Sequence, residues 1–101
     1  MITDEHNLAQ CVVAQLEARG LSQLLHQVCA ARGVTEFELC SRRRTRSVAH
    51  ARQELWWRIR AQPGRCYSFF EIAGWFHRDH STILHGVAAF QRRLLADQQL
   101  F

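Results

Sequence analysis

Residues 78–85 bring together side chains that can bind nucleic acid, in the order Arg-Asp-His-Ser-Thr-Ile-Leu-His. Asp79 is a good helix N-cap, because its carboxylate can accept hydrogen bonds from the free amides of Ser81 and Thr82. A helix that begins there presents short polar side chains at its positively polarised end, where helix-turn-helix proteins read base edges. The apolar residues that follow recur at helical spacing and predict a buried face: Ile83, Leu84, Val87 and Phe90.

Basic charge is concentrated in one part of the chain. Residues 41–65 contain eight arginines and one glutamate, a net charge of +7, whereas residues 1–40 carry −3 and residues 66–101 are neutral. A block of this kind inside a folded domain attracts polyanions. The cations are all arginine, whose planar fork suits phosphate and guanine. The charge pattern therefore favours DNA or RNA as a partner.

Length and composition set the broad class. The chain has 101 residues, of which 48% are hydrophobic, as expected for one folded domain with a small core. No apolar run reaches the ~20 residues that span a bilayer, and the acidic start of the chain lacks the basic region of a secretory signal. We therefore expect a cytoplasmic, nucleoid-associated protein without a membrane partner. The four cysteines form no C-x-x-C pair and are expected to be buried and reduced.

Helical spacing and capping residues predict an all-α fold. Expected helices cover residues 4–19, 21–32, a short segment after Thr35, 48–61, 69–76 and 80–97. Thr3 or Asp4 should cap the first, Thr35 and Glu38 should form a capping box, and Ser47 and Ser68 should cap later helices. Residues 41–46 are expected to form a basic loop. The last two helices, joined by a tight turn, make a helix-turn-helix within a small bundle.

The chain resembles the C-terminal DNA-binding domain, domain IV, of the bacterial replication initiator DnaA. That family's signature reads Arg-Asp-His-Ser/Thr-Thr-Val/Ile-Leu-His, and all eight positions match residues 78–85. The resemblance extends over about residues 21–95, including the basic loop at 41–46, the Val-Ala-x-x-Arg-Gln stretch at 48–53 and the Phe-Glu-Ile-Ala run at 70–73. It implies a domain at 21–101 preceded by a helical extension at 1–20. One departure lies in the turn, where the family usually has two glycines and this chain has only His77.

The resemblance also implies a set of DNA-binding residues. Arg44 matches an arginine that enters the minor groove, and Arg52 and Gln53 match a pair that contacts the DNA edge. Asp79, His80, Ser81 and Thr82 match the recognition-helix residues in the major groove, where His80 and the Thr82 methyl could contact thymine methyl groups. The residues expected at phosphates share a cation or a small polar group: Arg42, Arg43, Arg46, Ser68, Arg78 and His85.

These observations predict sequence-specific binding of double-stranded DNA at DnaA-box-like sites, with a role in replication initiation or transcription. The alternative is a protein-interaction adaptor that contacts the replication initiator or its inactivation machinery. Without lysine the chain cannot contain a G-x-x-x-x-G-K-S/T phosphate loop, so we expect no nucleotide cofactor. The spacing of His77, His80 and His85 is a poor fit to a metal pair. We expect no metal, no other cofactor and no catalytic residues, so not an enzyme. The tryptophans are expected to pack in the core, and His85 to bond a phosphate or the protein.

Overall fold

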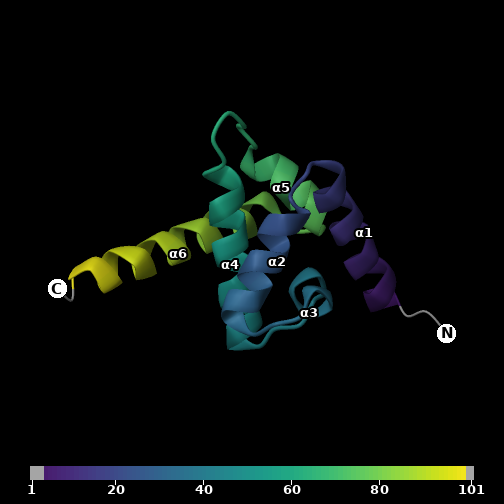
Figure 1. The fold of residues 1–101 in the computed structure, drawn as a ribbon, viewed down its shortest axis with the longest axis horizontal. Coiled ribbons are helices and arrows are strands. Elements are labelled where there is room, and N and C mark those ends of the chain that lie inside the picture. The colour runs from purple at the N-terminus through teal and green to yellow at the C-terminus, as the bar shows by residue number, and fades with distance from the viewer. Residues whose placement is uncertain (1–3, 100–101) are drawn as a thin grey trace.

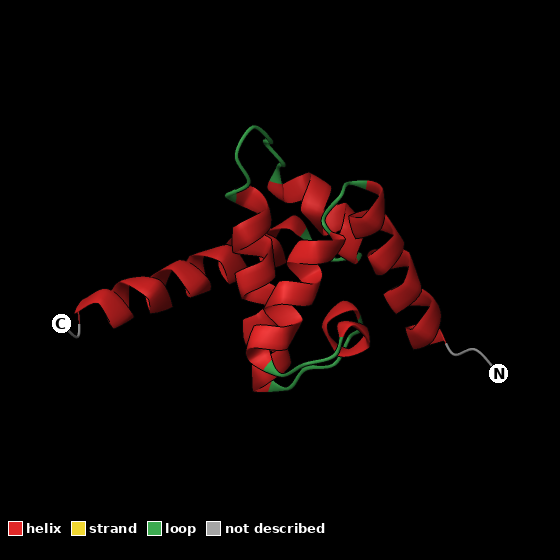
Figure 2. Ribbon diagram, viewed as in Figure 1, coloured by secondary structure: helices red, strands yellow, loops and turns green. Residues whose placement is uncertain are grey.

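The computed structural model describes residues 4–99, and over that range every regular element is an α-helix (Figures 1 and 2). The helices are α1 (Asp4–Ala18), α2 (Ser22–Arg32), α3 (Glu36–Cys40), α4 (Arg46–Arg60), α5 (Phe69–Phe76) and α6 (His80–Gln99). Helix α4 packs against α2 and α6, and α1 packs against α3, α5 and α2. The predicted all-α bundle with a helix-turn-helix is therefore confirmed.

The first three helices form as their sequences predict. Val12 and Leu16, one turn apart on α1, are fully buried in the same core as the later helices. Gly33 ends α2 in the left-handed conformation, at φ 67°, and donates its amide to the Cys29 carbonyl. Thr35 and Glu38 form the predicted capping box on α3, with both hydrogen bonds at 3.0 Å. The candidate cap Thr3 lies outside the described residues.

Helix α4 begins earlier than predicted. We expected Ser47 to be its N-cap, but the Thr45 hydroxyl accepts the Val48 amide at 3.4 Å and is the N-cap. An N-cap needs a non-helical backbone, and Thr45 is extended, at φ −71° and ψ 155°, whereas Ser47 already lies within the helix. Arg46 is consequently in the first turn of the helix, and the basic loop is limited to residues 41–45.

The turn between α5 and α6 places a non-glycine residue in a conformation that favours glycine. His77 has φ 54°, and it is the only non-glycine residue of the described chain with positive φ. The backbone closes α5 there, with the Arg78 amide donating to the Ala73 carbonyl at 2.9 Å. A side chain in the left-handed region costs ~1–2 kcal/mol. The helix-turn-helix angle is therefore set by backbone hydrogen bonds that outweigh this strain.

Helix α6 buries one face over its first half and then extends beyond the other helices (Figure 1). Ile83, Val87 and Phe90 are buried, as predicted. Leu84 was expected to share that face, but it is 43% exposed. One residue after Ile83 lies about 100° around a helix, so a core contacted by 83, 87 and 90 leaves position 84 in solvent.

The tryptophans stabilise the crossing of the helices, as predicted. Trp56 and Trp75 are buried, and Trp57 is partly buried against the core. Trp56 lies edge-on to Phe76 with ring centroids 5.7 Å apart, and it fills the space over Gly86 on α6. A Cβ at Gly86 would lie 2.7 Å from the Trp56 ring, so the glycine permits the close approach of α4 and α6.

The cysteine prediction is correct for two residues and wrong for two. All four are free thiols, but only Cys29 and Cys40 are buried, whereas Cys11 and Cys66 are exposed. Burial raises the pKa of Cys29 to about 11 and that of Cys40 to about 12, so both are protonated at neutral pH. Cys11 lies on the outer face of α1 and Cys66 in a loop, where no core is available to cover them.

None of the helices between residues 4 and 99 combines the length and apolarity that a bilayer crossing requires.

Candidate nucleic-acid interface

The amino-terminal tip of α6 is open to solvent. Asp79, His80 and Thr82 are exposed, and Ser81 is half-buried. We expected the Asp79 carboxylate to cap the helix by accepting the amides of residues 81 and 82. Instead it accepts the Ser81 hydroxyl at 2.5 Å, while the Thr82 amide donates to the Asp79 backbone carbonyl at 3.0 Å. The hydrogen bond from Ser81 is the main cause that lowers the pKa of Asp79, so this carboxylate is an acceptor at neutral pH.

The basic loop lies beside this tip. The half-buried Arg78 guanidinium points to the carbonyl of Ser41, with Nη2 and the carbonyl oxygen 3.5 Å apart. Burial lowers the pKa of Arg78, and the positive charges of Arg42 and Arg44 lower it further. The sequence separates Arg78 from the loop by more than thirty residues, and the fold brings their charges together. Three like charges held this close favour an anion between or beside them.

Arg52, which was predicted to contact the DNA edge, is almost wholly buried, and its side chain forms its hydrogen bonds inside the protein. Its side chain is 4% exposed. Nε donates to the Leu39 carbonyl at 2.7 Å, Nη1 to that of Arg43 at 2.5 Å, and Nη2 to those of Glu38 and Ser41 at 3.0 and 2.5 Å. Burial, followed by the charge of Arg78, lowers the Arg52 pKa to about 10, so it remains a cation at neutral pH. Arg52 therefore positions the basic loop.

A groove of about 600 Å³ runs between α4 and α6 and connects the loop with the tip. Arg44, Arg78 and Thr82 line it at one end, and Gln53, His85 and Arg92 line it farther along. The Gln53 side-chain oxygen accepts from Arg93 at 2.6 Å, which fixes the amide at the edge of the groove. Among the described residues that line this groove none is acidic, so its electrostatic character is positive.

The other predicted phosphate-binding residues differ in their surroundings. Arg42, Arg43 and Arg46 are exposed, and Arg43 lies 3.9 Å from the Glu38 carboxylate. Ser68 is the N-cap of α5, as predicted, and its hydroxyl accepts the Glu71 amide at 3.1 Å. This hydroxyl therefore has a structural role, and its O–H group can still donate to a phosphate. The exposed His85 lines the groove rather than bonding inside the domain.

Sequence reasoning missed two residues at this surface. Arg92 lines the far end of the groove, two turns after His85 on α6. Phe70, the second residue of α5, stacks on His80 with ring centroids 4.3 Å apart. The sequence signal available for Phe70 was its place on the helix, which predicts that the ring is exposed. The buried face of α5 consists of Ile72, Ala73, Trp75 and Phe76, and residue 70 lies outside it. Nothing local indicates that its partner is His80.

Comparison with known proteins shows which family the chain belongs to. A protein-family model described as the bacterial dnaA protein helix-turn-helix matches residues 21–89, which is more than two thirds of the chain. The chain belongs to the DnaA C-terminal helix-turn-helix family. No curated protein and no solved structure matched. The matched range of the DnaA domain includes every predicted DNA-binding residue, from Arg42 to His85.

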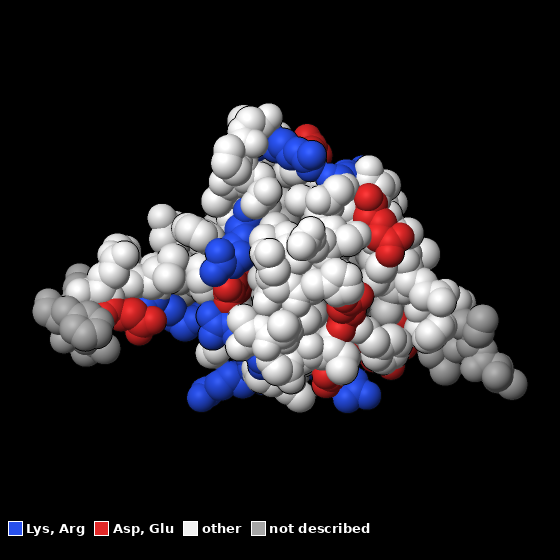
Figure 3. Space-filling model, viewed as in Figure 1, with Lys and Arg blue, Asp and Glu red and all other residues white. Residues whose placement is uncertain are grey.

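Membership in this family supports DNA binding by the chain, with double-stranded DNA as the partner. The DnaA C-terminal family is a DNA-binding helix-turn-helix family and not a catalytic one. Helix α1 precedes the matched range, yet its side chains share the core of the family domain. Figure 3 shows blue atoms beside α4 and the adjoining part of α6, and also at the top and lower edge of the face, with red atoms on the α1 side and toward the end of α6. Both signs of charge are therefore present on this face of the DnaA-type domain.

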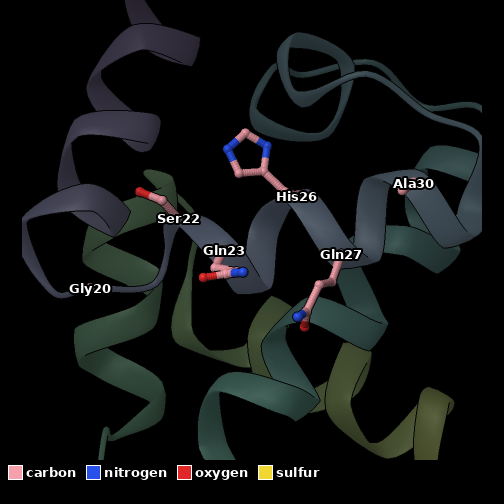
Figure 4. A pocket seen from close by; sticks show the side chains of 6 residues that line it. All are labelled: Gly20, Ser22, Gln23, His26, Gln27 and Ala30. Carbon is pink, nitrogen blue, oxygen red and sulfur yellow. The ribbon is translucent and has the colours of Figure 1, made fainter.

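A second hollow, of about 620 Å³, follows α2 on another part of the surface. Gly20, Ser22, Gln23, His26, Gln27 and Ala30 line it, and Figure 4 shows the polar side chains among them spread along the helix. His26 is the only titratable group among them, and its Nδ1 pairs with the Glu36 carboxylate. This hollow has no cluster of cations and lies apart from the DnaA helix-turn-helix residues, so the α4–α6 groove is the better candidate for binding DNA.

Proposed function

We propose that this chain binds double-stranded DNA sequence-specifically at DnaA-box-like sites and thereby regulates replication initiation or transcription. In this proposal residues 79–82 enter the major groove and Arg44 enters the adjacent minor groove. Arg42, Arg43, Arg46, Arg78 and His85 contact phosphates, which fix the register of the protein on the duplex. The division into an extension at 1–20 and a domain at 21–101, and a location at the nucleoid, belong to the same proposal.

The single observation that carries the proposal is the shared carbonyl of Ser41. Arg52 donates to it from inside the protein at 2.5 Å, and Arg78 approaches it at 3.5 Å from the turn that precedes the recognition helix. The basic loop and the tip of α6 are therefore held in one fixed arrangement. A fixed separation allows a minor-groove arginine and a major-groove helix to reach adjacent parts of one site without further ordering.

The proposed division of roles agrees with the chemistry of each side chain. Ionised Asp79 can accept a hydrogen bond from a cytosine amino group, and the Ser81 and Thr82 hydroxyls can bond a base or a phosphate. Arg44 is exposed at the mouth of the groove, where a guanidinium can follow the narrow, negative minor groove of A·T-rich DNA. Arg92 extends the cationic lining along α6 and adds a candidate phosphate contact.

The test is a binding titration of the whole chain with a DnaA-box duplex and a scrambled duplex at several salt concentrations. Arg44→Ala and His80→Ala should each weaken binding to the box by about 1–3 kcal/mol, with His80→Ala also reducing the preference for it. Arg65→Ala, which removes an exposed arginine at the loop between α4 and α5, is the control and should bind as the parent does. The proposal is wrong if the parent binds both duplexes equally, or if all three variants behave alike.

An adaptor role is the second candidate, and one surface favours it. A hollow of about 420 Å³ between α1 and α3 is lined by Ala9, Val13 and the 36% exposed Phe37, with Glu17 and Glu36 at its edge. A basic amphipathic helix of the replication initiator or of one of its regulators would fit this chemistry. Phe37→Ala separates the two candidates, because it should leave DNA binding unchanged and weaken only a protein complex.

A further inference from the structure

A hollow beside the basic loop is lined by both signs of charge. It has a volume of about 370 Å³ and lies between the first turns of α1 and the start of the loop, and its lining consists of Asp4, Glu5, Leu8, Arg42 and Arg43. All four charged side chains are exposed. The α4–α6 groove differs, because none of the described residues that line it is acidic. The basic loop therefore has one side without carboxylates and one side that faces them.

The packing of α1 holds its carboxylates at this place. Ala9 and Val12, on the next turns, are 3% and 0% exposed, and Leu8 packs against the same core. Helix α1 contacts α3, which leads into the basic loop, and the first turn of α1 lies in the same lower part of Figure 1 as α3. From α3 the Glu38 carboxylate adds a further negative group, 3.9 Å from the Arg43 guanidinium. Three carboxylates on two helices therefore surround this side of the loop.

Helix stability alone does not account for this arrangement. Asp4 and Glu5 lie in the first turn of α1, where a negative charge interacts favourably with the positive end of the helix. That interaction requires no arginine nearby, yet the same hollow contains two of the arginines assigned to phosphates. A guanidinium binds a carboxylate and a phosphate through the same donors. The two kinds of anion therefore compete for Arg42 and Arg43.

We propose that the first turn of α1 competes with DNA phosphates for Arg42 and Arg43 and so lowers the affinity of the chain for DNA. Its carboxylates offset the charge of the two arginines in the free protein and repel phosphates that approach them. Arg44 and Arg78 lie on the side of the loop without carboxylates. This inference rests on the proposed function and concerns its regulation. Helix α1 precedes the matched range, so the effect comes from a part of the chain that the family model does not cover.

The experiment measures the affinity of the whole chain for the DnaA-box duplex and the scrambled duplex, with and without Asp4→Asn/Glu5→Gln. In water, one repulsion between unit charges about 8 Å apart changes an affinity by a factor of about two. The double variant should therefore bind both duplexes about fivefold more tightly than the parent at ~0.05 M salt. The gain should fall below about twofold at ~0.3 M salt, where screening is stronger.

Glu17→Gln is the matched control for Glu5→Gln. Both variants lose one negative charge from α1, but Glu17 lies twelve residues further along the helix. That is about 18 Å along the axis, farther than the Debye length of about 14 Å at ~0.05 M salt. Glu5→Gln should tighten binding about twofold, and Glu17→Gln should stay within about 1.5-fold of the parent. Circular dichroism should show that both variants keep the helical content of the parent.

Arg42→Gln/Arg43→Gln tests whether the effect passes through the basic loop. A double-mutant cycle isolates the coupling between two sets of charges. Neutralising Asp4 and Glu5 in this background should tighten binding less than about twofold, compared with about fivefold in the parent. If the full gain remains without the two arginines, the carboxylates do not compete for them and the inference is overturned.

The remaining outcomes separate this inference from the proposed function. If the parent binds no duplex, the proposed function fails and this inference fails with it. If the parent prefers the box but Asp4→Asn/Glu5→Gln binds no more tightly, the inference is wrong and DNA binding stands. If Glu17→Gln tightens binding as much as Glu5→Gln does, the effect belongs to the net charge of the protein, and the assignment to the first turn of α1 is also wrong.

Discussion

Replacing Arg52 by methionine tests whether this buried arginine supports the basic loop. Methionine has a similar length and no donor, so the carbonyls that Arg52 contacts lose its hydrogen bonds. The Glu38 carbonyl keeps the Ser41 amide and hydroxyl, and the Ser41 carbonyl keeps Arg78. The Leu39 and Arg43 carbonyls are the two that depend most on Arg52.

The expected loss in the free energy of unfolding follows from those two carbonyls. A buried acceptor left without a donor costs ~1–3 kcal/mol, which applies to the Leu39 carbonyl; the Arg43 carbonyl is only partly buried and water can partly replace its donor, so the variant should lose about 1–4 kcal/mol. That is a large share of the ~5–15 kcal/mol of a small domain. Urea unfolding followed by far-ultraviolet circular dichroism measures it. Arg92→Met, which removes the same charge from an exposed position, should remain within about 0.5 kcal/mol of the parent.

Arg52→Lys separates support of the loop from a charge contact with DNA. Lysine keeps the charge but lacks the planar fork that reaches several carbonyls at once. If Arg52 positions the loop, the lysine variant is also destabilised, and its binding to the box duplex weakens under conditions where it is folded. A lysine variant with the stability and DNA affinity of the parent, beside a methionine variant that is stable but binds DNA poorly, would refute the reasoning.

Three further predictions test the packing and electrostatics of the fold. The Glu54 carboxylate is buried between two arginines; burial alone would raise its pKa, but hydrogen bonds from Arg58 and Arg32 lower the pKa overall. The ionised carboxylate therefore contributes its full stabilisation above pH 4.5, the ordinary pKa of the group, and loses it as the pH falls below that value. Urea titrations should show that Glu54→Gln is less stable than the parent at pH 7 and that its free energy of unfolding falls less on acidification. Gly86→Ala places a Cβ against the buried Trp56 ring and should lower the free energy of unfolding by about 1–3 kcal/mol. Gly74→Ala places a Cβ in open space on a helix and should raise the free energy of unfolding by about 0.5–1 kcal/mol. Equal effects of the two substitutions would contradict the close approach of α4 and α6 at Gly86. His77→Gly relieves the positive φ and should raise the thermal midpoint, and a lower midpoint would show that the imidazole contributes more than the strain costs.

The elements of the fold followed from local patterns in the sequence. Helices form through contacts three and four residues apart, and such spacing can be read directly. The capping box at Thr35 and Glu38, the cap at Ser68 and the buried face at Ile83, Val87 and Phe90 were predicted on this basis. The sequence predicted Ser47 as the N-cap of α4, but the structure shows Thr45 in this role.

The sequence by itself determined the fold class, the family and the position of the recognition helix, because each depends on neighbouring residues. Only the tertiary structure decided that Arg52 lies inside, that Leu84 is exposed and that Phe70 lies against His80. These outcomes depend on the angles at which helices cross, and those angles are set by side chains far apart in the chain, such as Trp56 and Gly86. A side chain's type shows what it can bind, and the packing around it decides whether solvent or DNA can reach it.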